Sequence, residues 1–163
     1  ATAALASSAL AERKRARLSS GLAFLSGLAD VLSYQHFGCY ANIMTGNTIA
    51  LSAALGAMQW GAVAFFSAVL VSFLTGFAAF RILDQHASRS KVVQILAVGI
   101  FFLCTSTDLC LFGLASHWPI LLLNVGFGAV NALSIERTGV ITCMVTGHVQ
   151  QLAGFIADSV TAS

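Results

Sequence analysis

The sequence has very little charge: only 9% of its 163 residues are charged, whereas 58% are hydrophobic. A soluble domain carries about 25% charged residues, so this composition excludes both a soluble globular protein and a disordered one. The net charge of only +2 also excludes a nucleic-acid-binding protein that relies on a broad basic surface. The composition therefore predicts an integral membrane protein.

Enzyme and metal motifs are also lacking. The sequence contains no GxSxG, HExxH, GxGxxG or P-loop motif. Its four cysteines form no CxxC pair and no Cys/His set with zinc-ligand spacing. No two carboxylates are grouped as a catalytic pair would be. We therefore expect neither an enzyme nor a metal site.

Long stretches without charge define the predicted helices. A helix that crosses the bilayer needs about 20 apolar residues. Four segments meet this length: 18–37, 60–82, 92–114 and about 119–135. Two shorter apolar segments, 42–57 and 143–158, would each be about 24 Å long as helices, and they either cross a thin region or enter the membrane and stop. The sequence thus predicts an all-α integral membrane protein with about six helices, four of them full spans and two short or broken.

The N-terminal segment 1–17 is distinct from the predicted membrane domain 18–163. Ala and Ser dominate residues 1–11, basic residues follow at 13–17, and the first residue is Ala. A segment of this kind either remains after an organelle-targeting peptide is cleaved or marks the boundary of an expressed fragment. We therefore expect an organellar membrane, either the thylakoid or the mitochondrial inner membrane.

An internal repeat connects two parts of the membrane domain at an ungapped offset of 101 residues. Each copy reads G-x-x-(D/N)-x-L-S-x4-G-x6-T-G, beginning at Gly27 in the first copy and at Gly128 in the second. The expected parts are repeat 1 over about 18–83, a linker helix over about 92–114 and a partial repeat 2 over about 119–158. The copies are inverted if the 42–57 segment returns to the side from which it entered, and parallel if it crosses.

Small residues recur every four positions in several predicted helices. One such stripe contains Asn124, Gly128 and Ala132, and another contains Ser72 and Gly76. Stripes of small residues let helix backbones approach closely in lipid. We therefore expect these helix faces to pack against other helices.

The most unusual polar residue of the predicted spans is Asp30, midway along 18–37. An ionisable side chain at that depth is costly and points to function. Its counterpart in the second copy is Asn131, which has the same shape and no charge. Such a pair could share a proton or bind a cation. Alternatively, Asp30 could bond to the nearby Thr-Gly loop and hold the repeat together.

The two Thr-Gly elements complete the candidate site. Each marks a point where a loop enters a short helix, whose N-terminus presents a partial positive charge to a polar substrate group. The predicted substrate-binding residues are Asp30, Thr45, Gly46, Asn47, Asn131, Thr146, Gly147 and His148. Capping of the two short helices is the simpler explanation of these elements. A histidine could also be the axial ligand of a tetrapyrrole such as chlorophyll, although no spacing requires one.

A resemblance to a known family rests on G-L-A-D-V-L-S-Y-x-x-F-G, then M-T-G-N-T at Met44–Thr48, and later G-x-x-N-A-L-S and M-V-T-G-H. Over about residues 18–158 the chain resembles the YoaK-type family of multi-pass membrane proteins of unknown function. The resemblance implies three helices, a linker helix and three more. Family members usually continue with one more apolar span, so this chain would hold three, one and two.

Two functions fit these features. A permease for a small polar molecule or ion is favoured by the repeat, the Thr-Gly breaks and Asp30. A non-catalytic accessory subunit of a larger photosynthetic or respiratory membrane complex, in contact with pigments or lipids, is favoured by the missing last span and the Ala/Ser-rich start. The expected partners are membrane lipid and either other subunits of a complex or further copies of the chain, but no nucleic acid.

Overall fold

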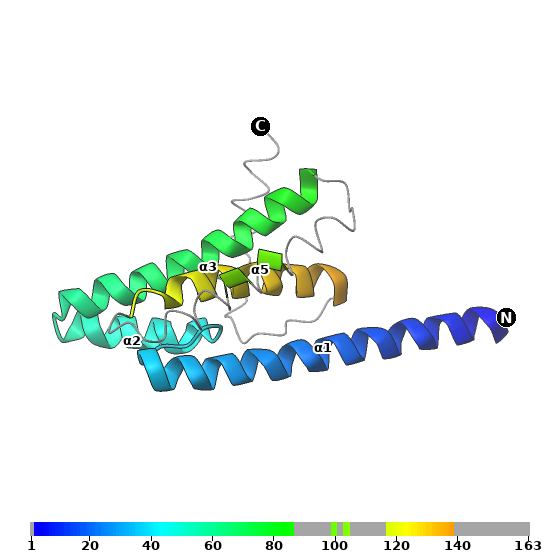
Figure 1. Cartoon of the computed structure of the whole chain (residues 1–163), viewed down its shortest axis with the longest axis horizontal. Coiled ribbons are helices and arrows are strands. Elements are labelled where there is room, and N and C mark those ends of the chain that lie inside the picture. The colour runs from blue at the N-terminus through cyan, green and yellow to red at the C-terminus, as the bar shows by residue number, and fades with distance from the viewer. Residues whose placement is uncertain (1, 87–98, 101–102, 105–116, 139–163) are drawn as a thin grey trace.

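The computed structural model describes residues 2–86, 99–100, 103–104 and 117–138. Its named elements are the helices α1 (Thr2–Phe37), α2 (Met44–Gly56), α3 (Trp60–His86) and α5 (Ile120–Thr138) (Figure 1). Within these ranges there is no strand. The prediction of an all-helical protein is therefore confirmed for the part of the chain that the structure describes.

The helix boundaries agree closely with those expected from the sequence. The short helix predicted at 42–57 is α2, the span predicted at 60–82 is α3, and the helix predicted from Pro119 is α5. The helix predicted at 18–37 ends as expected at Phe37, but it begins at Thr2 and continues through the basic cluster. The predicted helix at 143–158 and most of the one at 92–114 lie outside the described residues.

Only one helix among the described residues is long and apolar enough to cross a membrane, namely the 26-residue stretch Trp60–Gln85 of α3. A shorter apolar stretch, Ile120–Ile135, lies in α5. The segment predicted as a full span at 18–37 is not among the helices that are long and apolar enough to cross a membrane. Several serines and Asp30 interrupt the apolar sequence of α1 there. The prediction of four full spans is thus reduced to one in the described part of the chain.

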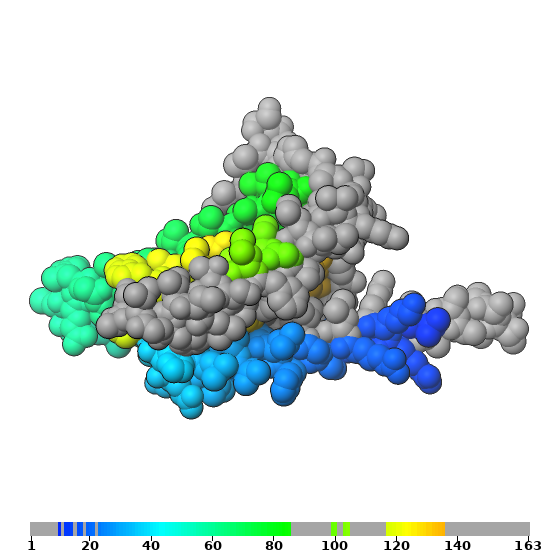
Figure 2. Space-filling view, viewed as in Figure 1, coloured from blue at the N-terminus to red at the C-terminus, as the bar shows by residue number. Residues whose placement is uncertain are grey.

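The helices α2 and α3 form an antiparallel pair, and α3 and α5 form a parallel pair (Figure 1). The segment 38–43 turns the chain back before α2 begins, and α2 and α3 then run in opposite directions. The helix α5 packs along α3 and runs in the same direction, whereas α1 runs opposite to α5. The N-terminal half of α1 projects beyond the other helices (Figure 2). The basic end of α1 and the C-terminal end of α3 therefore point the same way.

Two residues with positive φ end α1 and α2. Gly38 has a φ of +68°, and its N–H donates to the carbonyl of Tyr34 at 3.0 Å. This is the left-handed C-terminal cap in which glycine is common because it lacks a Cβ. At the corresponding position after α2 stands Met58, with a φ of 52°. Both turns redirect the chain abruptly, so the segments 38–43 and 57–59 can join closely packed helices.

The helices α3 and α5 touch through their backbones. A Cβ on Gly76 would clash with the backbone of Val125, and a Cβ on Gly128 would clash with the carbonyl of Phe73. These two glycines belong to the small-residue stripes, so the expected close packing is confirmed at this crossing. Next to the crossing of α3 and α5 lies a cluster of buried apolar side chains. Its members are Cys39, Ala41, Met44, Val69, Phe73, Ile120, Leu123 and Phe127.

Candidate functional site

The interior of the described bundle is unusually polar. Nine polar or charged side chains are buried: Ser26, Asp30, Ser33, Asn42, Asn47, Asp84, Asn124, Asn131 and Ser134. At the same time, large apolar side chains of α1 are exposed, among them Phe24 at 71% and Val31 at 56%. A soluble protein distributes its residues in the opposite way. Polar groups turned inward and apolar groups turned outward suit helices that pack together in lipid.

The asparagines form a distinct set within this interior. The chain has four, namely Asn42, Asn47, Asn124 and Asn131, and each is at most 1% exposed. A buried carboxamide needs hydrogen-bond partners, because an unpaired one costs about 1–3 kcal/mol per group. Which of these four side chains are paired within the protein therefore decides which remain free to bind something else.

Asn47, in the M-T-G-N-T string, is fully paired with the peptide groups of Tyr40. Its Nδ2 donates to the Tyr40 carbonyl at 2.7 Å, and its Oδ1 accepts from the Tyr40 N–H at 2.9 Å. One side chain thus satisfies two backbone groups that the non-helical segment leaves without helical partners. Asn47 therefore fixes segment 38–43 to α2, and its binding of substrate stays a prediction.

Asp30 is bonded to the same segment from α1. Its Oδ1 accepts from the N–H of Asn42 at 2.7 Å and from the N–H of Ile43 at 3.2 Å. Ile43 is the N-cap residue of α2 and provides no side-chain cap of its own. The Asp30 carboxylate therefore occupies the positive end of α2, where the sequence analysis expected a substrate group. Of the two alternatives for Asp30, the structure shows the bond to the Thr-Gly loop.

Asp30 and Asn131 share no hydrogen bond, since within the described part of the chain neither amide atom of Asn131 has a hydrogen-bond partner. The Asp30 carboxylate is paired instead with the backbone N–H groups before α2. That these two residues share a proton or bind a cation stays a prediction.

Gly46 of the Thr-Gly element makes room for an aromatic ring. A Cβ on Gly46 would lie 2.5 Å from Cε2 of Tyr40, and the Tyr40 ring stacks on Tyr34 with a centroid distance of 4.9 Å. The neighbouring Thr45 is half-buried and is engaged in an interaction of its own. In the first copy of the repeat, the Thr-Gly element thus packs a loop against a helix.

Segment 38–43 is non-helical backbone inside the bundle. Cys39 and Ala41 are at most 1% exposed and belong to the same cluster as Val69 and Phe73 of α3. Val69 lies about 14 Å along α3 from its first residue, well inside the helix that is long and apolar enough to cross a membrane. Irregular backbone is tolerated at such depth only where it is buried in protein or lines a cavity.

Asn124 and Asn131 of α5 are buried without partners. Neither the Oδ1 nor the Nδ2 atom of either side chain has a hydrogen-bond partner, and the Oδ1 of Asn42 is also unpaired. Asn42 uses its Nδ2 to donate to Ser26 Oγ. Asn131 is among the predicted site residues, whereas Asn124 is predicted only as part of a packing stripe and Asn42 is not predicted to be functional. One feature of the sequence could have identified all of them: the chain has few asparagines, and all lie in or beside apolar segments.

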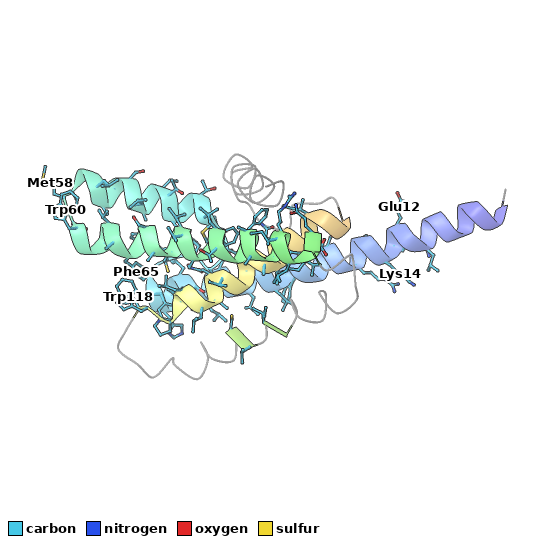
Figure 3. The ribbon with its side chains drawn as sticks, turned by 90° about the horizontal axis from the view of Figure 1, so that it is seen from above. Glu12, Lys14, Met58, Trp60, Phe65 and Trp118 are labelled. Atoms are coloured by element: carbon cyan, nitrogen blue, oxygen red, sulfur yellow. The ribbon has the colours of Figure 1, made fainter. Side chains whose placement is uncertain are left out.

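An aromatic recess of about 400 Å³ lies at one end of the bundle, away from the predicted residues. Its lining consists of Phe37, Gly61, Ala62, Phe65, Phe66, His117 and Trp118. Figure 3 shows Met58, Trp60, Phe65 and Trp118 near this end, whereas Glu12 and Lys14 lie at the other. Aromatic side chains gathered at one end are typical of a membrane–water interface.

The second Thr-Gly element, with Thr146, Gly147 and His148, lies outside the described residues. Across the residues that the structure does describe, no group of three or more His, Cys, Asp or Glu side chains could hold a metal ion. Within the described part of the chain, the buried side-chain atoms without partners belong to neutral carboxamides.

Comparison with known proteins gives a family but no function. No curated protein and no solved structure matches the chain significantly. The family described as "Protein of unknown function (DUF1275)" matches residues 18–162, which is nearly all of the predicted membrane domain. The chain therefore belongs to the DUF1275 family.

Proposed function

We propose that this chain is a non-catalytic, permease-like membrane protein that moves a small polar molecule or ion. The observation that carries the proposal is the presence on α5 of two fully buried carboxamides, Asn124 and Asn131, which have no hydrogen-bond partner among the residues that the structure describes. Buried polar groups in stable cores are almost always paired. Unpaired groups of this kind are therefore expected where a polar molecule binds.

The buried segment 38–43 supports the same proposal. Many transporters bind their substrate near the membrane midplane, where helices are interrupted. Here the interruption is held in place by Asp30 and Asn47, and its buried residues share a cluster with Leu123 and Phe127, which flank Asn124 in the α5 sequence. The part of α5 that carries Asn124 therefore packs close to a fixed break in the helical backbone.

The directions of α1 and α5 support an inverted repeat. These helices carry the two copies of the motif, at Gly27–Ser33 and at Gly128–Ser134, and they run in opposite directions (Figure 1). An inverted pair of this kind is a common basis of alternating access in transporters. The M-T-G-N-T string and its resemblance to YoaK-type proteins favour the same multi-pass arrangement of about six helices.

The test is flux through the purified chain in liposomes. A panel of small polar solutes and ions is supplied, and the wild type is compared with an Asn124→Leu/Asn131→Leu variant. The control is Thr75→Val, which removes a hydroxyl from an exposed position of α3, where it bonds only to Val71 within the helix. We expect flux in the wild type and the control and its loss in the double variant. Absence of flux for every solute and ion would contradict the proposal.

An accessory subunit of a larger membrane complex is the second candidate. The observation that favours it is an apolar stripe on α1, formed by Phe24, Leu28 and Val31, with exposures of 71%, 47% and 56%. Residues at this spacing lie on one helix face, which lipid, a pigment or a helix of another subunit could cover. Native gel electrophoresis of gently solubilised membranes from its own organelle tests this role. A high-mass band with fixed partners would support it, and migration as a monomer or a small homo-oligomer would count against it.

A further inference from the structure

The described charged side chains are either exposed to the surroundings of the bundle or already bonded within the protein. On α1, Glu12, Arg13, Lys14 and Arg17 are exposed in the projecting N-terminal half. The Asp30 carboxylate accepts two backbone N–H groups. Arg81 and Asp84, near the end of α3, both have interactions of their own. Among the side chains that the structure describes, none beside Asn124 and Asn131 therefore offers an unengaged charge to compensate the charge of a buried ion.

The unpaired groups themselves have a definite chemistry. Each carboxamide provides two N–H donors and one carbonyl oxygen that accepts up to two hydrogen bonds, and it carries no net charge. Burying an ion beside neutral groups alone is costly in a low-dielectric interior. A neutral solute with hydroxyl or amide groups can satisfy both the donors and the acceptor at much lower cost. The asparagines are thus better suited to an uncharged hydrogen-bonding molecule than to an ion.

The spacing of the two asparagines suggests successive binding positions. They are seven residues apart on α5, so they lie nearly in line along the helix and about 10 Å apart. A molecule with only a few heavy atoms would contact one carboxamide and then the other. Several weak positions in series also allow a solute to leave as readily as it binds, which conduction requires.

We infer that the solute is small and uncharged and carries both hydrogen-bond donors and acceptors, as polyols and simple amides do. Asn124 and Asn131 are its successive binding groups. This inference rests on the proposed transport function and narrows it, because it excludes ions as the main substrate.

The experiment measures the permeation of neutral solutes and of ions in the same preparation of proteoliposomes. Stopped-flow light scattering follows entry of glycerol, erythritol and urea, and fluorescence follows Na⁺, K⁺ and Cl⁻ movement under an applied potential. The wild type is compared with Asn124→Leu, Asn131→Leu and the Thr75→Val control, each checked for an unchanged size-exclusion profile. We expect entry of at least one neutral solute, a reduction of about five- to tenfold in each Asn→Leu variant, and no change in the control.

A second substitution covers the case in which leucine prevents folding. Asn131→Asp keeps the shape of the side chain but removes both N–H donors, so neutral-solute entry should still fall. Ion movement without neutral-solute entry would overturn the inference while leaving a transport function in place. Unchanged entry in the folded Asn124 and Asn131 variants would overturn the assigned residues. Absence of all flux in the wild type would overturn both the inference and the proposed function.

Discussion

Gly128 of α5 lies directly against the carbonyl of Phe73 of α3, so close that no Cβ could be placed between them. Its counterpart in the sequence repeat, Gly27 of α1, would have nothing within 4 Å of an added Cβ. The two copies of the motif thus share a residue type but place it in different surroundings. In α5 the glycine permits a backbone contact between helices, whereas the structure shows no such contact at the equivalent position of α1.

This difference predicts unequal effects of the same substitution. Gly128→Ala should destabilise the protein by about 3 kcal/mol, because the new methyl group forces α3 and α5 apart. Gly27→Ala should not destabilise the protein and should stabilise it by up to about 1 kcal/mol, because alanine favours a helix interior over glycine. Thermal unfolding of both variants in the same detergent measures the difference. Equal destabilisation by the two substitutions would contradict the helix contact described here.

Asn47→Leu should destabilise the protein by about 3 kcal/mol, because it leaves the buried N–H and carbonyl of Tyr40 without partners. Asn47→Asp keeps the acceptor but removes the donor, so its effect should be intermediate. The control is Ser52→Ala, whose exposed hydroxyl bonds only within α2. Unfolding midpoints of the three variants provide the measurement. A loss of flux without any loss of stability in Asn47→Leu would instead indicate a direct role in binding solute.

Asp30→Asn should fold and should retain neutral-solute flux. Both backbone N–H groups bond to the same carboxylate oxygen, and asparagine can present an oxygen there, at a cost of about 1 kcal/mol for the lost charge. Asp30→Leu removes the acceptor and should cost about 3 kcal/mol. Measuring both the unfolding midpoint and the flux of each variant distinguishes a structural role of Asp30 from a role in transport. Complete loss of flux in a stable Asp30→Asn protein would show that Asp30 carries a proton or cation.

Gly46→Ala should destabilise α2 packing by about 1–3 kcal/mol, because its methyl group would meet the ring of Tyr40. The matched control is Gly56→Ala, at the end of the same helix, where nothing lies within 4 Å of an added Cβ. Adding Tyr40→Ala to Gly46→Ala should recover part of the loss, because the two residues are in contact. A double-mutant cycle of unfolding midpoints that shows simple additivity would contradict this contact.

Met58→Gly should stabilise the protein by about 1 kcal/mol. After α2 the N–H of Gln59 donates to the carbonyl of Ala54 at 2.9 Å, which is the bond of a Schellman turn. Met58 holds the left-handed position of that turn, where a side chain is unfavourable. Met58→Ala keeps the strained conformation and so should give no gain in the unfolding midpoint. A gain of equal size in both variants would assign the effect to the exposed methionine side chain instead.

Much of the helical fold could be predicted from local sequence. Gly38 ends α1 and Pro119 precedes α5, and each of these residues acts on its immediate neighbours only. The extension of α1 to Thr2 differs from the predicted start at residue 18, because apolar length indicates only a membrane span, whereas alanine-rich and charged sequences also form helices readily.

The sequence by itself determined where α1 ends and where α2, α3 and α5 form, that the chain has little charge for a soluble domain, and which few polar residues lie in apolar segments. Only the tertiary structure decided which of those polar residues are paired. Asn47 and Asn131 have the same side chain, yet Tyr40 pairs with the first and no described residue pairs with the second. The reason is that helix formation depends on neighbours along the chain, whereas a side-chain hydrogen bond depends on which distant segments the fold brings together.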